Sequence, residues 1–129
     1  MARILIVDDD QGATSLLEKL MIAEGHEPKS VNQSSKAIEV ASQMSPDLIM
    51  LDLMMPEPTG FQLCRMLREK SEFVYTPVLI VTALDDSDSQ VVAFGAGAND
   101  YITKPFRVDE LIQKIRVLLS PASGIIRRV

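Results

Sequence analysis

The sequence contains one cysteine, Cys64, and one histidine, His26. A single cysteine excludes an internal disulfide, and it also excludes a zinc site built from several cysteines. A single histidine argues against a metal or catalytic site made mainly of imidazole groups. We expect Cys64 to be a reduced structural thiol on a helix.

Long apolar runs and clusters of positive charge are also missing. No run approaches the roughly 20 apolar residues that a membrane-spanning helix needs, and the N-terminus lacks the features of a cleavable signal peptide. The net charge is −5 at pH 7, and the one basic cluster is Arg127-Arg128. We therefore expect a cytoplasmic protein with no membrane partner and no direct nucleic-acid binding by this segment.

The chain has 129 residues, of which 47% are hydrophobic and 24% are charged. These values are typical of a single globular domain. Three runs are apolar throughout, as in strands buried on both faces of a parallel sheet. They cover residues 4–7, 48–51 and 78–81, and two weaker strands are predicted at 27–31 and 100–103.

Segments of helical period lie between and after these strands. They cover residues 12–24, 35–44, a segment starting after Thr59, 87–96 and 107–119. Ser34 is a candidate N-cap for the second helix, and Thr59 with Gln62 forms a candidate capping box for the third. The fourth helix carries Val91, Val92 and Phe94 as its apolar residues.

Strands and helices therefore alternate five times, which predicts an α/β fold: a doubly wound, parallel, five-stranded sheet covered on both faces. We assign the domain to residues 1–119. Residues 120–129 follow the last predicted helix and are interpreted as a C-terminal tail or the start of a linker.

Polar side chains follow the strands at the point where each strand ends. Asp8 and Asp9 follow the first strand, Asp52 the third, Thr82 the fourth and Lys104 the fifth. The carboxyl ends of parallel strands lie along one edge of the sheet, so these groups are expected to converge.

Three converging carboxylates repel one another, and a hard divalent cation removes that conflict. Ligands that are all oxygen favour Mg²⁺ or Mn²⁺ over zinc. Lys104 and Thr82 can contact a tetrahedral anion. A carboxylate in such surroundings is suited to accept a phosphoryl group, and Asp52 is the best candidate because it ends a central strand.

Simpler interpretations exist for each motif alone. The triplet Asp8-Asp9-Asp10 resembles a helix N-cap, where carboxylates interact favourably with the helix dipole. A single Asp or Thr after a strand is often a turn residue. The conjunction of these residues at the ends of four strands favours a site.

Four stretches in this order resemble the receiver domain of bacterial two-component response regulators, the CheY-like family. They cover residues 4–10, 51–56, 81–83 and 97–106. The resemblance extends over residues 3 to about 119, and it implies the flavodoxin-like strand order 2-1-3-4-5.

The resemblance also implies a role for each residue of the site. Asp52 matches the phosphoacceptor. Asp8 and Asp9 match the acids that hold Mg²⁺ together with Asp52, and Met54 matches the position whose backbone carbonyl is a further ligand. Thr82 and Lys104 match the residues that contact the phosphoryl group.

The remaining implications concern switching. Tyr101 matches an aromatic switch that turns inward when the threonine moves, and the Lys104-Pro105 bond matches one that is cis in the family. The chain departs from the family at Glu57-Pro58-Thr59, although Gly60 matches.

On this resemblance the chain is a phosphoacceptor switch and not a metabolic enzyme, although it catalyses its own phosphotransfer and dephosphorylation. The donor would be a sensor histidine kinase or a phosphotransfer protein. Phosphorylation would alter the face formed by the fourth helix, the fifth strand and the fifth helix, and the output would pass to a C-terminal effector domain or a downstream protein.

Three alternatives remain open from the sequence. A flavodoxin-like cofactor carrier would need a phosphate-binding loop after the first strand, where Asp8-Asp9-Asp10 stands instead. A phosphohydrolase with an Asp nucleophile would resemble a pattern with a second acid at position 54, which is Met54. A degenerate receiver would act by protein binding alone, yet no expected site residue is missing.

Overall fold

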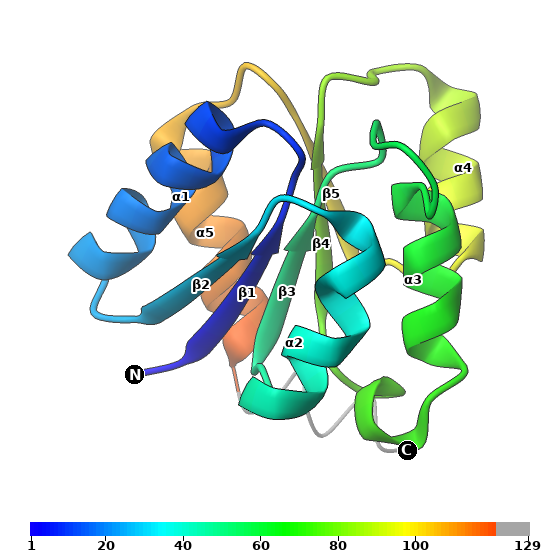
Figure 1. The fold of residues 1–129 in the computed structure, drawn as a ribbon. Helices are drawn as coiled ribbons and strands as arrows, with labels where there is room; N and C mark the ends of the chain where they lie inside the picture. The colour runs from blue at the N-terminus through cyan, green and yellow to red at the C-terminus, as the bar shows by residue number, and fades with distance from the viewer. Residues whose placement is uncertain (121–129) are drawn as a thin grey trace.

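The computed structural model describes residues 1–120, and they form a parallel sheet with helices on both faces (Figure 1). The strands are β1 (Arg3–Val7), β2 (Glu27–Val31), β3 (Leu48–Leu51), β4 (Val78–Thr82) and β5 (Asp100–Thr103). The helices are α1 (Gln11–Ala23), α2 (Ala37–Met44), α3 (Gly60–Arg68), α4 (Ser87–Gly95) and α5 (Val108–Leu119). Two short 3₁₀ turns, η1 (Ser34–Lys36) and η2 (Ser71–Phe73), precede α2 and β4.

The sheet has the order β2-β1-β3-β4-β5, and every neighbouring pair is parallel. The predicted α/β class, strand order and alternation are confirmed. Of the predicted tail at 120–129, all but Ser120 lies outside the described residues.

The central strands are buried because alternate side chains pack into two different layers. Ile4 and Ile6 belong to a core with α1 and α5, whereas Leu5 and Val7 belong to a core with α2, α3 and α4. Figure 1 shows these two groups of helices on opposite sides of the sheet. Burial on both faces explains why the strand sequences are apolar without alternation.

Side-chain caps fix the starts of three helices. Asp10 caps α1 and Asp86 caps α4. The predicted capping box of Thr59 and Gln62 is present at α3.

The prediction that Ser34 caps the second helix is wrong. Ser34 lies in η1, α2 starts at Ala37 without a side-chain cap, and the Ser34 hydroxyl donates a hydrogen bond to the carbonyl of Pro56 at 3.0 Å. The hydroxyl is therefore used for a contact between loops.

The apolar side chains of α4 point mostly outward. Val91, Val92 and Phe94 are 70%, 44% and 45% exposed, and the buried residue of the helix is Ala93. α4 thus packs on the sheet through a small side chain and leaves its larger ones exposed.

The Lys104–Pro105 peptide bond is cis, as expected, and so is Glu57–Pro58. Among the described residues, the helices are too short or too polar for any of them to cross a membrane.

Candidate metal and phosphoryl site

The loop after β1 supplies two carboxylates to the site and a third to a helix. Asp8 is buried and Asp9 is exposed. Asp10 accepts a hydrogen bond from the backbone of Gly12 at 2.9 Å and so caps α1. The site interpretation and the N-cap interpretation therefore apply to different members of the triplet.

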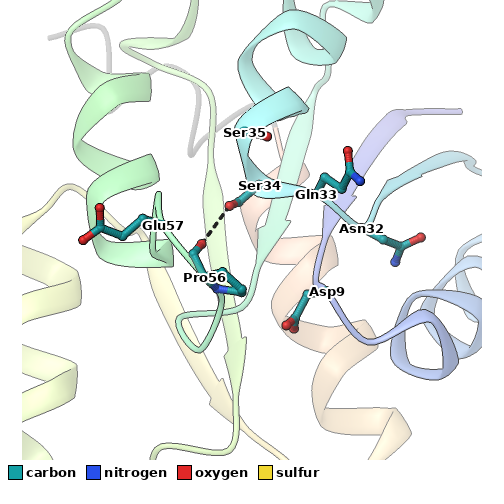
Figure 2. A pocket seen from close by; sticks show the side chains of 7 residues that line it. All are labelled: Asp9, Asn32, Gln33, Ser34, Ser35, Pro56 and Glu57. Atoms are coloured by element: carbon teal, nitrogen blue, oxygen red, sulfur yellow. Dashed lines mark hydrogen bonds between the residues drawn. The ribbon is translucent and has the colours of Figure 1, made fainter.

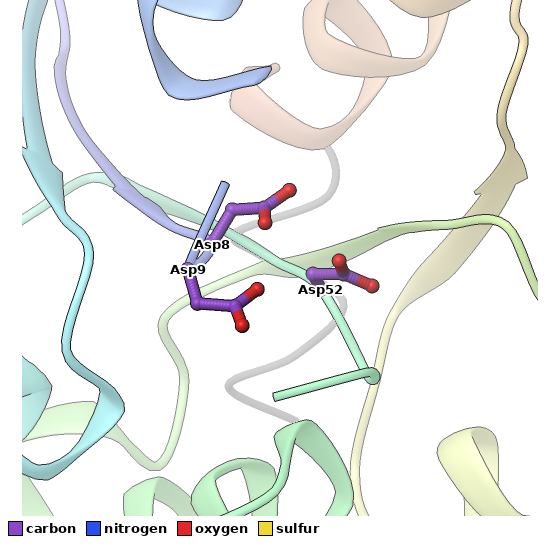
Figure 3. A group of neighbouring side chains, drawn as sticks. All are labelled: Asp8, Asp9 and Asp52. Atoms are coloured by element: carbon purple, nitrogen blue, oxygen red, sulfur yellow. The ribbon is translucent and has the colours of Figure 1, made fainter. Parts of the chain in front are cut away.

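β3 lies next to β1 in the sheet, with Val7 opposite Leu51, so the residues that follow the two strands are neighbours. Asp52 follows β3, is buried, and accepts a hydrogen bond from the backbone N–H of Met54 at 3.2 Å. One carboxylate oxygen from each of Asp8, Asp9 and Asp52 lies within 4.8 Å of the others. Figure 3 shows the three side chains gathered where the loops after β1 and β3 meet.

Lys104, after β5, reaches the same cluster. Its Nζ lies 2.7 Å from Oδ2 of Asp8 and 3.5 Å from Oδ2 of Asp52. Burial lowers the pKa of Lys104, but the hydrogen bond to Asp8 and the charges of the two aspartates outweigh it, so the pKa lies above its ordinary value. Lys104 is therefore a stable cation beside the acids.

One ammonium does not neutralise three carboxylates. Burial raises the pKa of Asp8, and the hydrogen bonds from Lys104 and from the Asp10 backbone offset only part of this increase. A divalent cation would restore the balance of charge.

Three carboxylates at this spacing fit a hard cation that prefers oxygen ligands, and they fit Mg²⁺ or Mn²⁺ better than zinc. Asp8, Asp9 and Asp52 would hold the ion. The assignment of the Met54 backbone carbonyl as a further ligand stays a prediction.

Thr82 ends β4, the strand next to β3, and is fully buried. Its hydroxyl accepts a long hydrogen bond of 3.5 Å from the backbone N–H of Leu84. The carbonyl of Leu84 accepts a hydrogen bond of 2.6 Å from the hydroxyl of Tyr101. Thr82 and Tyr101 are thus joined through a single residue of the β4–α4 loop.

Tyr101 is buried and its ring centroid lies 6.3 Å from that of Phe94 on α4. Burial raises the pKa of Tyr101, and the charges of Asp86, Asp85 and Asp52 raise it further. The hydroxyl therefore stays protonated and donates to the loop.

Gly60, the first residue of α3, packs directly against the chain that follows β3. A methyl group at this position would lie 2.5 Å from the Cα of Leu53 and closer still to the carbonyl oxygen of Asp52. Both neighbours are backbone atoms and cannot move aside cheaply. The absence of a side chain at residue 60 is therefore what lets α3 approach the Asp52 loop.

Replacing Gly60 with alanine is expected to lower the free energy of unfolding by about 3 kcal/mol, the upper part of the range for overpacking. Urea unfolding followed by circular dichroism measures the change. The matched control is Gly95→Ala, because an added methyl on Gly95 meets nothing within 4 Å. That variant should be neutral, or more stable by up to about 1 kcal/mol from helix propensity. Equal stability of the two variants would contradict the argument.

A hollow lies beside the carboxylate cluster, between the end of β2 and the loop after β3 (Figure 2). It is lined by Asp9, Asn32, Gln33, Ser34, Ser35, Pro56 and Glu57. Apart from Asp9, none of these residues was predicted to belong to the site. The contacts of Asn32 with Asp8 and of Ser34 with Pro56 join residues that are 24 and 22 positions apart, so no local sequence pattern marks these two residues.

Comparison with known proteins supports one family. A family model described as "Response regulator receiver domain" matches residues 4–116. The chain is 40% identical over 119 residues to the DNA-binding dual master transcriptional regulator RpaA of Synechocystis, covering 92% of this chain and 49% of that protein. It is 36% identical over 125 residues to the transcriptional regulatory protein TrcR of Mycobacterium tuberculosis, covering 97% of this chain and 48% of that protein. The chain thus spans about half the length of the curated relatives it matches.

Solved structures agree with the sequence relatives. A putative response regulator from Chloroflexus aurantiacus has a TM-score of 0.87 at 31% identity, covering 92% of this chain and 97% of that one. The activated N-terminal receiver domain of Klebsiella pneumoniae RstA has a TM-score of 0.85 at 29% identity, covering 91% and 97%.

Proposed function

Because the chain belongs to the response regulator receiver domain family, we propose that it is a signalling switch that accepts a phosphoryl group on Asp52 with the help of Mg²⁺. The observation that carries the proposal is the convergence of Asp8, Asp9 and Asp52, with Lys104 Nζ within 3.5 Å of Asp52. The chain catalyses the transfer to itself and the later hydrolysis. In this sense it is a switch and not a metabolic enzyme.

In the proposed reaction a carboxylate oxygen of Asp52 attacks the phosphorus of a phosphohistidine. A P–O bond forms as the P–N bond of the donor breaks, and the departing imidazole nitrogen takes up a proton. When bound, Mg²⁺ would neutralise the charge on the phosphoryl oxygens. Lys104 is close enough to Asp52 to pair with those oxygens, and Asp8 holds its ammonium in place at 2.7 Å.

The donor we propose is a sensor histidine kinase or a phosphotransfer protein in the cytoplasm. The relatives are about twice as long as this chain, and some of them are described as DNA-binding regulators. We propose that the output passes either to an effector domain that follows the receiver or to a downstream protein. With a net charge of −5, the receiver segment itself is not proposed to bind nucleic acid.

Incubation of the purified chain with a small acyl phosphate and Mg²⁺ tests this function. We expect one phosphoryl group per chain by intact-mass spectrometry, labile to base as an acyl phosphate is, and no label when a chelator removes the metal. A chain that stays unmodified with Mg²⁺ and excess donor would contradict the proposal and favour a receiver that signals by binding alone.

Thr82 is proposed to transmit the signal and not to accept the phosphate. Because its hydroxyl reaches Leu84, which in turn holds Tyr101, movement of Thr82 toward a phosphoryl group would alter the β4–α4 loop. The change would then extend to the face formed by α4, β5 and α5.

Thr82→Ala should therefore still be labelled, with a rate lowered by about tenfold, the equivalent of one lost hydrogen bond. Hydrogen exchange over residues 85–119 should then change little on phosphorylation, whereas the wild-type chain should respond. Thr82→Ser keeps the hydroxyl and is expected to preserve the response. An unaltered response in Thr82→Ala would show that the coupling takes another route.

A further inference from the structure

The short segment after β2 contacts both loops that carry the carboxylates. We propose that Asn32 and Ser34 are positioning residues, which hold the loops after β1 and β3 at the spacing that a divalent cation requires. The inference rests on the metal site of the proposed function and adds two residues to it.

The side chain of Asn32 holds the loop after β1 by bonding the backbone of Asp8. Its side-chain amide donates a hydrogen bond of 2.9 Å to the carbonyl of Asp8 and another of 3.1 Å to the hydroxyl of Thr14. The N–H of Asp8 donates to the carbonyl of Val31 at 3.2 Å. Both polar backbone groups of Asp8 are therefore tied to the end of β2.

Asn32 is also held in place by Thr14 of α1. Thr14 is buried in α1 and its hydroxyl donates to the carbonyl of Gln11 at 3.1 Å. The amide of Asn32 thus connects the loop after β1, at Asp8, to the first turns of α1, at Thr14. Loss of this bridge would free the backbone that sets the direction of Asp8 and Asp9.

Ser34 makes the matching contact with the other loop. It is buried, and its hydroxyl donates to the carbonyl of Pro56 at 3.0 Å, as the dashed line in Figure 2 shows. Pro56 lies in the loop that starts at Asp52 and ends where α3 begins. Ser34 therefore fixes the distance of that loop from the end of β2.

Asp9 directly follows Asp8, whose carbonyl Asn32 holds. It is exposed and lines the same hollow as Asn32 and Ser34. Repulsion between Asp8 and Asp9 in the loop after β1 and Asp52 in the loop after β3 acts to drive the two loops apart. The hydrogen bonds of Asn32 and Ser34 to the two loops oppose that movement before any cation binds, which reduces the free energy of reorganisation on binding.

The test measures Mg²⁺ affinity directly, by NMR titration of the purified chain with MgCl₂ and without a phosphoryl donor. Asn32→Ala and Ser34→Ala should each lose about tenfold in Mg²⁺ affinity, the lower end of the loss expected when a group that orients a metal site from outside the ligand set is removed. Ser34→Thr keeps the hydroxyl and should retain the affinity. The matched control is Gln33→Ala, which removes a side chain from the same segment and the same hollow.

Urea unfolding without metal separates positioning from a general loss of stability. If Asn32→Ala does not fold, the comparison of Ser34→Ala with Ser34→Thr still decides the question. Folded Asn32→Ala and Ser34→Ala variants with wild-type affinity would overturn the inference and leave the proposed function intact, and so would an equal loss in Gln33→Ala. A wild-type chain that accepts phosphate but binds no Mg²⁺ would overturn the metal site and this inference together.

Discussion

Asp52→Asn is expected to reduce phosphoryl labelling from one group per chain to background. The amide has no negative oxygen to attack phosphorus, while its size and its place at the end of β3 are unchanged. Its oxygen can still accept the hydrogen bond that the backbone N–H of Met54 now donates to the carboxylate at 3.2 Å. The variant should therefore fold normally, and the loss should be one of chemistry.

The sharpest control lies at the other end of the same strand. Asp47 directly precedes β3, and its carboxylate accepts a hydrogen bond from the backbone of Arg3 at 2.8 Å. Asp47→Asn makes the same chemical change at the opposite end of β3 and should leave labelling of Asp52 unaffected. Stoichiometric labelling of Asp52→Asn would move the phosphoacceptor to another residue.

Asp9→Ala is expected to lower Mg²⁺ affinity by at least about a hundredfold, more than the loss of a residue that only supports a ligand. Phosphoryl labelling at millimolar Mg²⁺ should fall with it. Asp9 is exposed, so its removal leaves no buried polar group unpaired and should have little effect on stability. The experiment is a Mg²⁺ titration of variant and wild type, followed by intact-mass spectrometry after incubation with the donor.

Asp10→Asn is the matched control for Asp9→Ala. Asp10 is adjacent in sequence but its carboxylate caps α1 through Gly12, and asparagine is an equally good N-cap. Metal affinity should stay close to that of the wild type. If Asp9→Ala titrates like the parent chain, or if Asp10→Asn loses affinity equally, Asp9 is not the ligand we assign.

Much of the fold was predictable because its signals are local. Runs such as residues 48–51 are apolar on both faces because both faces are covered, and caps such as Thr59 act within one helical turn. The order of the strands in the sheet could not be predicted from local sequence, because the residues of β1 do not indicate which strands lie beside it. It came from resemblance to the receiver family.

In the candidate site, too, some residues could be predicted from local sequence and others could not. Acids and a lysine that follow strands could be grouped once a parallel sheet was assumed, because all strands end at one edge. Asn32 and Ser34 could not be found, as their partners, Asp8 and Pro56, lie 24 and 22 residues away. The local pattern makes Ser34 only a candidate N-cap for the second helix, because serine is one of the preferred N-cap residues.

Because side chains of the sheet pack into two layers, the isoleucine residues form two sets, one in each layer, that NMR can observe separately. Ile4, Ile6 and Ile102 face the layer of α1 and α5, whereas Ile49 and Ile80 face the layer of α2, α3 and α4, which also contains Tyr101. One sample labelled on isoleucine methyl groups would therefore view both sides of the sheet at once. A structural change confined to one layer would alter the methyl chemical shifts of that layer's isoleucines and leave those of the other layer unchanged. No engineered probe is needed.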